Sequence, residues 1–183
     1  RWLGLDPGTA ELDLATLDVV DDRTRVVAVA GASNLLGTIP PVRTVADRAH
    51  EVGALVHVDG VHLTAHRLPD PGALGADLYA CSPYKFLGPH LGCLVAAPAL
   101  LETLHPDKLL PSTDAVPERF ELGTLPYEQL AGTTAAIDFL AGLAGPEGEA
   151  VDPPGVWSAS VMGAIMGRRL AGLPDDYVPE AAQ

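Results

Sequence analysis

Residues 26–59 read VVAVAGASNLLGTIPPVRTVADRAHEVGALVHVD, and this stretch decides the fold class. It contains two short apolar runs, Val26–Ala30 and Leu55–Asp59, which are typical of buried strands. Between them, two prolines that fit a first helical turn precede apolar residues at helical spacing up to Val52. A strand, a helix and a second strand in this order predict a β-α-β unit with parallel strands.

The same alternation continues along the chain. Leu78–Cys81 and Leu91–Ala97 predict a third and a fourth strand, and a helix is expected to begin near Pro98. Tyr127–Leu143 predicts a longer helix. We therefore expect an α/β domain whose mostly parallel central sheet is flanked by helices.

Composition narrows the classes of partner. The chain has 183 residues and a formal net charge of −13, which argues against nucleic acid and against an anionic membrane surface. The two cysteines, Cys81 and Cys93, form no metal motif or disulfide framework, so we interpret them as buried structural residues of a cytoplasmic protein. The pair Glu118-Arg119 is interpreted as solvated charge.

Polar residues follow three of the predicted strands. Asn34 comes after the first strand, Asp59 and His62 end and follow the second, and Ser82 and Lys85 follow the third. In open α/β sheets, ligands bind at the edge formed by the carboxyl ends of the strands. The sequence therefore predicts one site at that edge.

Lys85 is the most informative of these residues, because the chain has only two lysines against nine arginines. Lysine forms Schiff bases, since its amine can lose a proton and a guanidinium cannot. Lys85 lies in a turn directly after a strand, whereas Lys108 lies in Pro-Asp-Lys without such a context. Asp59 could pair with the pyridinium nitrogen of pyridoxal phosphate, or it could merely cap the turn that follows it.

A metal site is the alternative interpretation of the same region. His62 and His66 are spaced i, i+4 and could join Asp59 as ligands. The HExxH pattern fails, however, because Leu63 stands where that pattern has glutamate. We therefore predict no metal.

Three linked motifs carry a family resemblance: Asn34-Leu-Leu-Gly-Thr-Ile-Pro40, Gly53-Ala-Leu-Val-His-Val-Asp-Gly-Val-His62 and Gly75-Ala-Asp-Leu-Tyr-Ala-Cys-Ser-Pro-Tyr-Lys-Phe-Leu-Gly-Pro89. In this order they resemble the class V aminotransferase family of pyridoxal-phosphate enzymes. They look most similar to its cysteine desulfurase-like group, where His62 replaces a more usual glutamine. Phe120-Glu-Leu-Gly-Thr124 resembles the motif that comes next.

The resemblance implies pyridoxal 5′-phosphate as cofactor and an amino acid as substrate. Lys85 would form the Schiff base and later move the Cα proton, and Asp59 would bind the pyridinium nitrogen. His62 and Asn34 would lie near the 3′-oxygen of the cofactor.

For the cofactor's phosphate, the resemblance implies Ser82 in the same subunit and Thr124 in the partner subunit, and hence a homodimer. The turn departs from the family pattern Ser-Gly-His-Lys, since Pro83 and Tyr84 stand in the middle. Proline removes a backbone N–H, and a phenol is a neutral donor, so the phosphate contacts differ from the usual ones.

The resemblance also implies the domain organisation. We expect a fold-type I large domain that is incomplete at both ends: its central part over residues 1–145, a linker over 146–155, and a helix over 156–183 that leads toward a small C-terminal domain. The expected chemistry is that of a cysteine desulfurase, although an aminotransferase, a β-lyase and an epimerase share its first step. A non-catalytic dimerisation scaffold is the further alternative. The chain by itself is expected to be inactive, because part of the site lies outside it.

Overall fold

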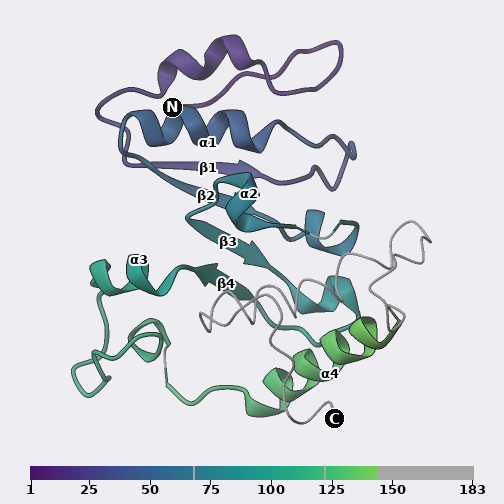
Figure 1. Cartoon of the computed structure of the whole chain (residues 1–183), viewed down its shortest axis with the longest axis vertical. Helices are drawn as coiled ribbons and strands as arrows, with labels where there is room; N and C mark the ends of the chain where they lie inside the picture. The colour runs from purple at the N-terminus through teal and green to yellow at the C-terminus, as the bar shows by residue number, and fades with distance from the viewer. Residues whose placement is uncertain (68, 122, 144–183) are drawn as a thin grey trace.

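The computed structural model describes residues 1–67, 69–121 and 123–143 (Figure 1). The elements, with η for a 3-10 helix, are η1 (Leu14–Val19), β1 (Val26–Ala30), α1 (Val42–Glu51), β2 (Leu55–Asp59), η2 (Leu63–Ala65), α2 (Pro71–Leu74), β3 (Leu78–Cys81), η3 (Pro83–Phe86), β4 (Cys93–Ala96), α3 (Pro98–Thr103), η4 (Glu118–Phe120) and α4 (Tyr127–Leu143). The predicted linker and the last predicted helix lie outside the described residues. Within the described part of the chain, no helix is long and apolar enough to cross a membrane.

The four strands form one sheet in the order β1-β2-β3-β4 (Figure 1). The first three are parallel, and β4 runs antiparallel to β3. This confirms the predicted mostly parallel sheet. The fourth strand is shorter than predicted at both ends, because residues 91 and 92 belong to the loop that connects η3 to β4 and Ala97 caps the start of α3.

The core lies between the sheet and α1, as Figure 1 shows for the helix running along β1 and β2. The helix turns four residues inward, and each is at most 2% exposed: Val42, Val45, Ala46 and Ala49. They pack in one cluster with Val56 and Val58 of β2 and with Tyr79 of β3. Each fully buried valine contributes about 1.5–3 kcal/mol of hydrophobic stabilisation, so this cluster holds α1 against the three parallel strands.

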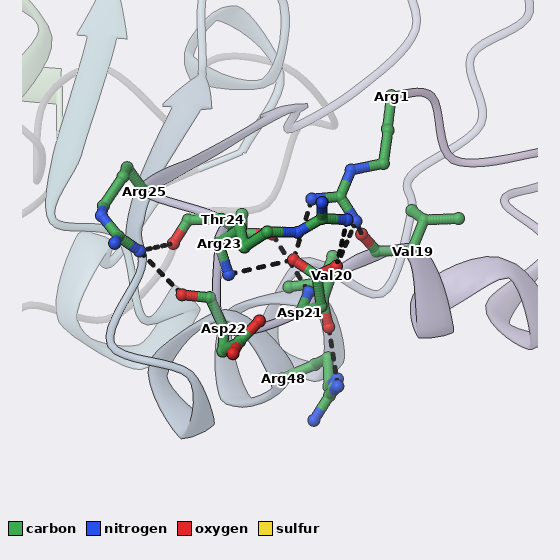
Figure 2. Close-up of polar contacts among 9 residues, drawn as sticks. All are labelled: Arg1, Val19, Val20, Asp21, Asp22, Arg23, Thr24, Arg25 and Arg48. Carbon is green, nitrogen blue, oxygen red and sulfur yellow. Dashed lines mark hydrogen bonds and ion pairs between the residues drawn. The ribbon is translucent and has the colours of Figure 1, made fainter.

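A cluster of polar contacts connects residues 1–21 to helix α1 (Figure 2). The Asp21 carboxylate accepts hydrogen bonds from Arg1 at 2.7 and 2.8 Å and from Arg23 at 3.1 Å. These charge-assisted bonds lower the pKa of the Asp21 carboxyl, with Arg1 as the main cause. Arg48 of α1 donates to the Val20 carbonyl at 2.6 Å. Residues 1–21 are thereby held beside β1.

Between this segment and β1 lies a groove of about 880 Å³. Its lining is mainly apolar and comes from residues 1–41, including all of β1. None of the predicted site residues lines it, so this groove and the predicted chemistry occupy different places on the sheet.

The prediction of solvated charge at Glu118-Arg119 is wrong for Arg119. Its side chain is buried, with 8% exposure, and it donates to Glu102 Oε2 at 2.7 Å and to the Leu104 carbonyl at 3.3 Å. The reason is tertiary: the chain around η4 folds back onto the end of α3, so a residue in a polar stretch becomes the centre of that contact.

Candidate functional site at the carboxyl edge of the sheet

The predicted site residues sit at the ends of the three parallel strands. Asp59 is the last residue of β2, Ser82 directly follows β3, and Asn34 lies in the turn after β1. The ladder continues one step beyond β2, where the Gly60 N–H donates to the Ala80 carbonyl at 2.8 Å. Because parallel strands share one carboxyl edge, these three residues lie along the same edge of the sheet.

Asp59 is exposed, and its position is fixed by one hydrogen bond. Its Oδ1 accepts from the Val61 N–H at 3.0 Å, so the carboxylate caps the turn that follows it. Among the described residues, Oδ2 forms no hydrogen bond. The two interpretations of Asp59 are therefore compatible, because turn capping uses one oxygen and leaves the other for a ligand.

A buried contact behind Asp59 supports this turn. A Cβ atom on Gly60 would lie 2.0 Å from Cζ of Tyr79, so only glycine fits against the ring. The Tyr79 hydroxyl pairs with Oγ1 of Thr64 at 2.9 Å, and both side chains are fully buried. Burial raises the pKa of Tyr79 to about 12. Sequence reasoning missed this contact, although a glycine after a strand-end aspartate was a usable signal.

Lys85 lies in η3, a short helix with a constrained backbone. Pro83 occupies its first turn, and the Lys85 N–H donates to the Ser82 carbonyl at 3.0 Å. The helix ends at Leu87, which adopts a left-handed conformation with φ of 69°, and the Gly88 N–H then donates to the Pro83 carbonyl at 2.8 Å. Strained backbone of this kind tends to cluster at functional sites, where surrounding structure maintains it.

The two lysines differ sharply in their surroundings. Lys108 Nζ donates to the Ser112 carbonyl at 2.7 Å and pairs with Asp114 at 3.1 Å. Lys85 is half-buried, and its Nζ forms no hydrogen bond or ion pair with any residue that the structure describes. Of the two lysines, Lys85 is thus the one whose amine is not engaged by another group among the described residues.

His62 lies close to Lys85, since η2 and η3 pack together. Burial lowers the pKa of His62, and the positive charges of His66 and Lys85 lower it further. The rings of His62 and His66 are 4.6 Å apart and tilted by 58°. No group of three or more histidine, cysteine, aspartate or glutamate residues in the described ranges could hold a metal ion, so the metal interpretation gains no support.

The remaining site residues are less constrained. Ser82 precedes η3, but its hydroxyl does not cap the helix, and Asn34 is exposed. Thr124 is exposed just before α4, and no contact among the described residues links it to the other five. Tyr84 stacks on His90 with ring centroids 5.1 Å apart, a pairing that sequence reasoning did not foresee.

These residues suit pyridoxal phosphate chemically. The cofactor needs an amine for its aldehyde and a carboxylate for its ring nitrogen, and Lys85 and Asp59 present both at one edge. The unpaired Nζ and Oδ2 are the two atoms that such a ligand would use. The fold is that of an open α/β protein, a class in which ligands bind at the carboxyl ends of the parallel strands.

Known proteins are similar to this chain. The family described as aminotransferase class-V matches residues 2–147. A probable cysteine desulfurase from Streptomyces coelicolor is 41% identical over 154 residues, which cover 76% of this chain and 36% of that protein. A cysteine desulfurase from Haloferax volcanii is 35% identical over 147 residues, with 74% and 34% covered. The crystal structure of an Escherichia coli cysteine desulfurase matches with a TM-score of 0.68 at 28% identity, over 76% of this chain and 38% of that one.

The chain belongs to the aminotransferase class-V family, whose members depend on pyridoxal phosphate. The matched region includes all six predicted site residues. The chain spans about a third of the length of the curated relatives it matches.

Proposed function

We propose that this chain forms the central part of the cofactor site of a pyridoxal-phosphate enzyme and that Lys85 binds the cofactor through its side-chain amine. The observation that carries the proposal is the contrast between the lysines. Lys85 Nζ is unpaired among the described residues and lies at the edge that presents Asp59, whereas Lys108 is engaged with Asp114. When bound, the cofactor supplies an electron sink that stabilises negative charge at the Cα of an amino acid.

Asp59 and His62 would set the electronic state of the cofactor ring. Oδ2 of Asp59 would accept a hydrogen bond from the ring nitrogen and keep it protonated, while Oδ1 stays on the Val61 N–H. The pKa of His62 lies below its ordinary value, so a neutral imidazole would face the 3′-oxygen. Asn34 would hydrogen-bond the same region of the ring.

The phosphate would be bound from two subunits. The Ser82 hydroxyl is not used as a helix cap, which supports its role as a phosphate donor. Thr124 is exposed, and among the described residues no contact links it to the other site residues, which supports a contact to the phosphate of a partner subunit and hence a homodimer. In this arrangement each site is complete only when two copies associate.

Lys85 would also move the proton in the reaction. With its amine free, Lys85 would be a base within the same site. It would take the Cα proton and return it at a later step. Proton transfer by a positioned side chain typically contributes about 10²–10⁴-fold in rate.

Cysteine is the substrate that the comparisons favour, because the relative from Streptomyces coelicolor is named as a probable cysteine desulfurase and the one from Haloferax volcanii as a cysteine desulfurase. We therefore propose cysteine desulfurase-like chemistry, in which the C–S bond of cysteine breaks, alanine is released and the sulfur atom passes to an acceptor thiol as a persulfide, which dithiothreitol reduces to sulfide. The two unpaired cysteines of the chain are typical of a reducing compartment, which supports a cytoplasmic location.

The experiment uses the longest reading frame that contains this sequence, with added pyridoxal phosphate, cysteine and dithiothreitol. We expect sulfide and alanine in equal amounts, with a rate that falls by about 10²-fold or more in Lys85→Ala. Lys108→Ala is the matched control and should retain the rate. Turnover of cysteine to pyruvate, transfer of its amino group, or its racemisation would each replace the desulfurase proposal with the lyase, aminotransferase or epimerase alternative.

A further inference from the structure

Cys81 and Cys93 face each other across the antiparallel pair β3–β4. Cys81 is the last residue of β3, Cys93 is the first residue of β4, and the two are direct partners in the register. Directly opposite residues place their side chains on the same face of a sheet. Opposite Cα atoms in antiparallel strands are about 4.5 or about 5.5 Å apart, and both values lie within the range that a disulfide spans.

The two thiols are chemically unequal. Cys81 is buried, with 4% exposure, and Cys93 is only half-buried. A hydrogen bond with Cys81 lowers the pKa of the Cys93 thiol, and the same bond, with burial, raises the pKa of the Cys81 thiol. Cys93 is therefore the sulfur that ionises first and that a reagent in solvent reaches first.

Oxidation of the two cysteines would affect the loop that carries Lys85, because the cysteines lie at its two ends. The cysteines occupy the last rung of the ladder, where the strands can approach each other with least disturbance to the sheet. The chain between them, residues 82–92, is the loop that includes η3 and Lys85. A bond between the two sulfurs would join both ends of this loop covalently.

We propose that Cys81 and Cys93 form a reversible disulfide that closes the base of the Lys85 loop. The oxidant is a low-molecular-weight disulfide such as oxidised glutathione. The Cys93 thiolate attacks one sulfur of the oxidant, which breaks its S–S bond and releases one thiolate. Cys81 then attacks Cys93 Sγ, and the second small thiolate leaves and takes up the Cys81 proton. Two protein thiols are oxidised and one small disulfide is reduced to two thiols.

The test begins with the unmodified 183-residue chain, within which Cys81 and Cys93 are the two cysteines. The chain is equilibrated with mixtures of reduced and oxidised glutathione, quenched with acid, alkylated and analysed by intact mass and peptide mapping. We expect the mass to fall by two hydrogens, both alkylation sites to disappear, and a linked Cys81–Cys93 peptide that dithiothreitol reverses. Hydrogen exchange in residues 82–92 should slow in the oxidised form.

Single variants test the inequality between the sulfurs. In Cys81→Ser the remaining Cys93 should accept one glutathione, whereas in Cys93→Ser the remaining Cys81 should react at least about ten times more slowly. The proposal is overturned if both thiols stay free, if each takes up glutathione without a link between them, or if the link forms only in denaturant. None of these outcomes depends on whether Lys85 binds a cofactor.

Discussion

Gly60→Ala is expected to destabilise the protein strongly, because the position behind Asp59 has no room for a side chain. The new Cβ would lie 2.0 Å from Cζ, 2.1 Å from Oη and 2.5 Å from Cε1 of Tyr79. Carbon atoms in contact prefer about 3.5–4.0 Å, so the overlap is about 1.5 Å or more. The Tyr79 ring cannot move away, since it is fully buried and its hydroxyl is hydrogen-bonded to Thr64. Overpacking of this kind costs about 1–3 kcal/mol, and we expect the upper end.

Urea unfolding followed by far-ultraviolet circular dichroism measures this loss as a fall in the free energy of unfolding. Gly92→Ala is the matched control, because a Cβ on Gly92 meets nothing within 4 Å. In a Tyr79→Val background, which removes the ring, Gly60→Ala should cost less than half as much. The reasoning is refuted if Gly60→Ala and Gly92→Ala differ by less than about 0.5 kcal/mol.

Three further predictions concern the same framework. Tyr79→Phe should lower the free energy of unfolding by about 1–2 kcal/mol, because the Thr64 hydroxyl loses its buried hydrogen-bond partner. Adding Thr64→Val should restore part of this loss of stability. If urea titrations show no restoration, the hydrogen bond does not explain the effect of Tyr79→Phe. The pKa of His62 is lowered from 6.5, mainly by burial, so the contribution of the neutral imidazole to stability should be complete above pH 6.5 and decline as the pH falls below that value. A proton NMR titration midpoint at or above 6.5 would contradict this. The pKa of the Asp21 carboxyl lies below 3.8, mainly because of Arg1, so Asp21→Asn should lower the melting temperature at pH 7. The difference in melting temperature from the unmodified chain should shrink as the pH falls below 3.8. An equal difference at pH 3 and pH 7 would refute the ion pair as the cause.

Much of the fold could be predicted because it depends on local patterns. The apolar runs at Val26–Ala30, Leu55–Asp59 and Leu78–Cys81 coincide with β1, β2 and β3, since continuous apolar sequence is typical of parallel strands. The prediction of a buried strand is wrong for β1, where three of the five residues are exposed, because β1 lies at the edge of the described sheet. The carboxyl edge followed from their order, because parallel strands end on the same side. The sequence therefore located the ends of these strands, and with them Asp59 and Lys85.

Contacts between distant segments could not be predicted in this way. The Tyr79–Thr64 hydrogen bond and the pairing of Cys81 with Cys93 both depend on the register or packing of separate segments, which no local spacing reveals. The burial of Arg119 depends on how the chain returns to α3. The same limit applies to the two lysines. The sequence could not show that Lys108 Nζ is paired with Asp114, whereas Lys85 Nζ has no partner among the described residues.

Covalent trapping shows whether Lys85 is the residue that binds pyridoxal phosphate. The longest reading frame that contains this sequence is mixed with pyridoxal phosphate, reduced with borohydride and digested, and the labelled peptide is identified by mass spectrometry. We expect label on Lys85, its loss in Lys85→Ala, and no change in Lys108→Ala. Label shared equally between Lys85 and Lys108, or absent from Lys85 in a folded protein, would rule out Lys85 as the cofactor-binding lysine.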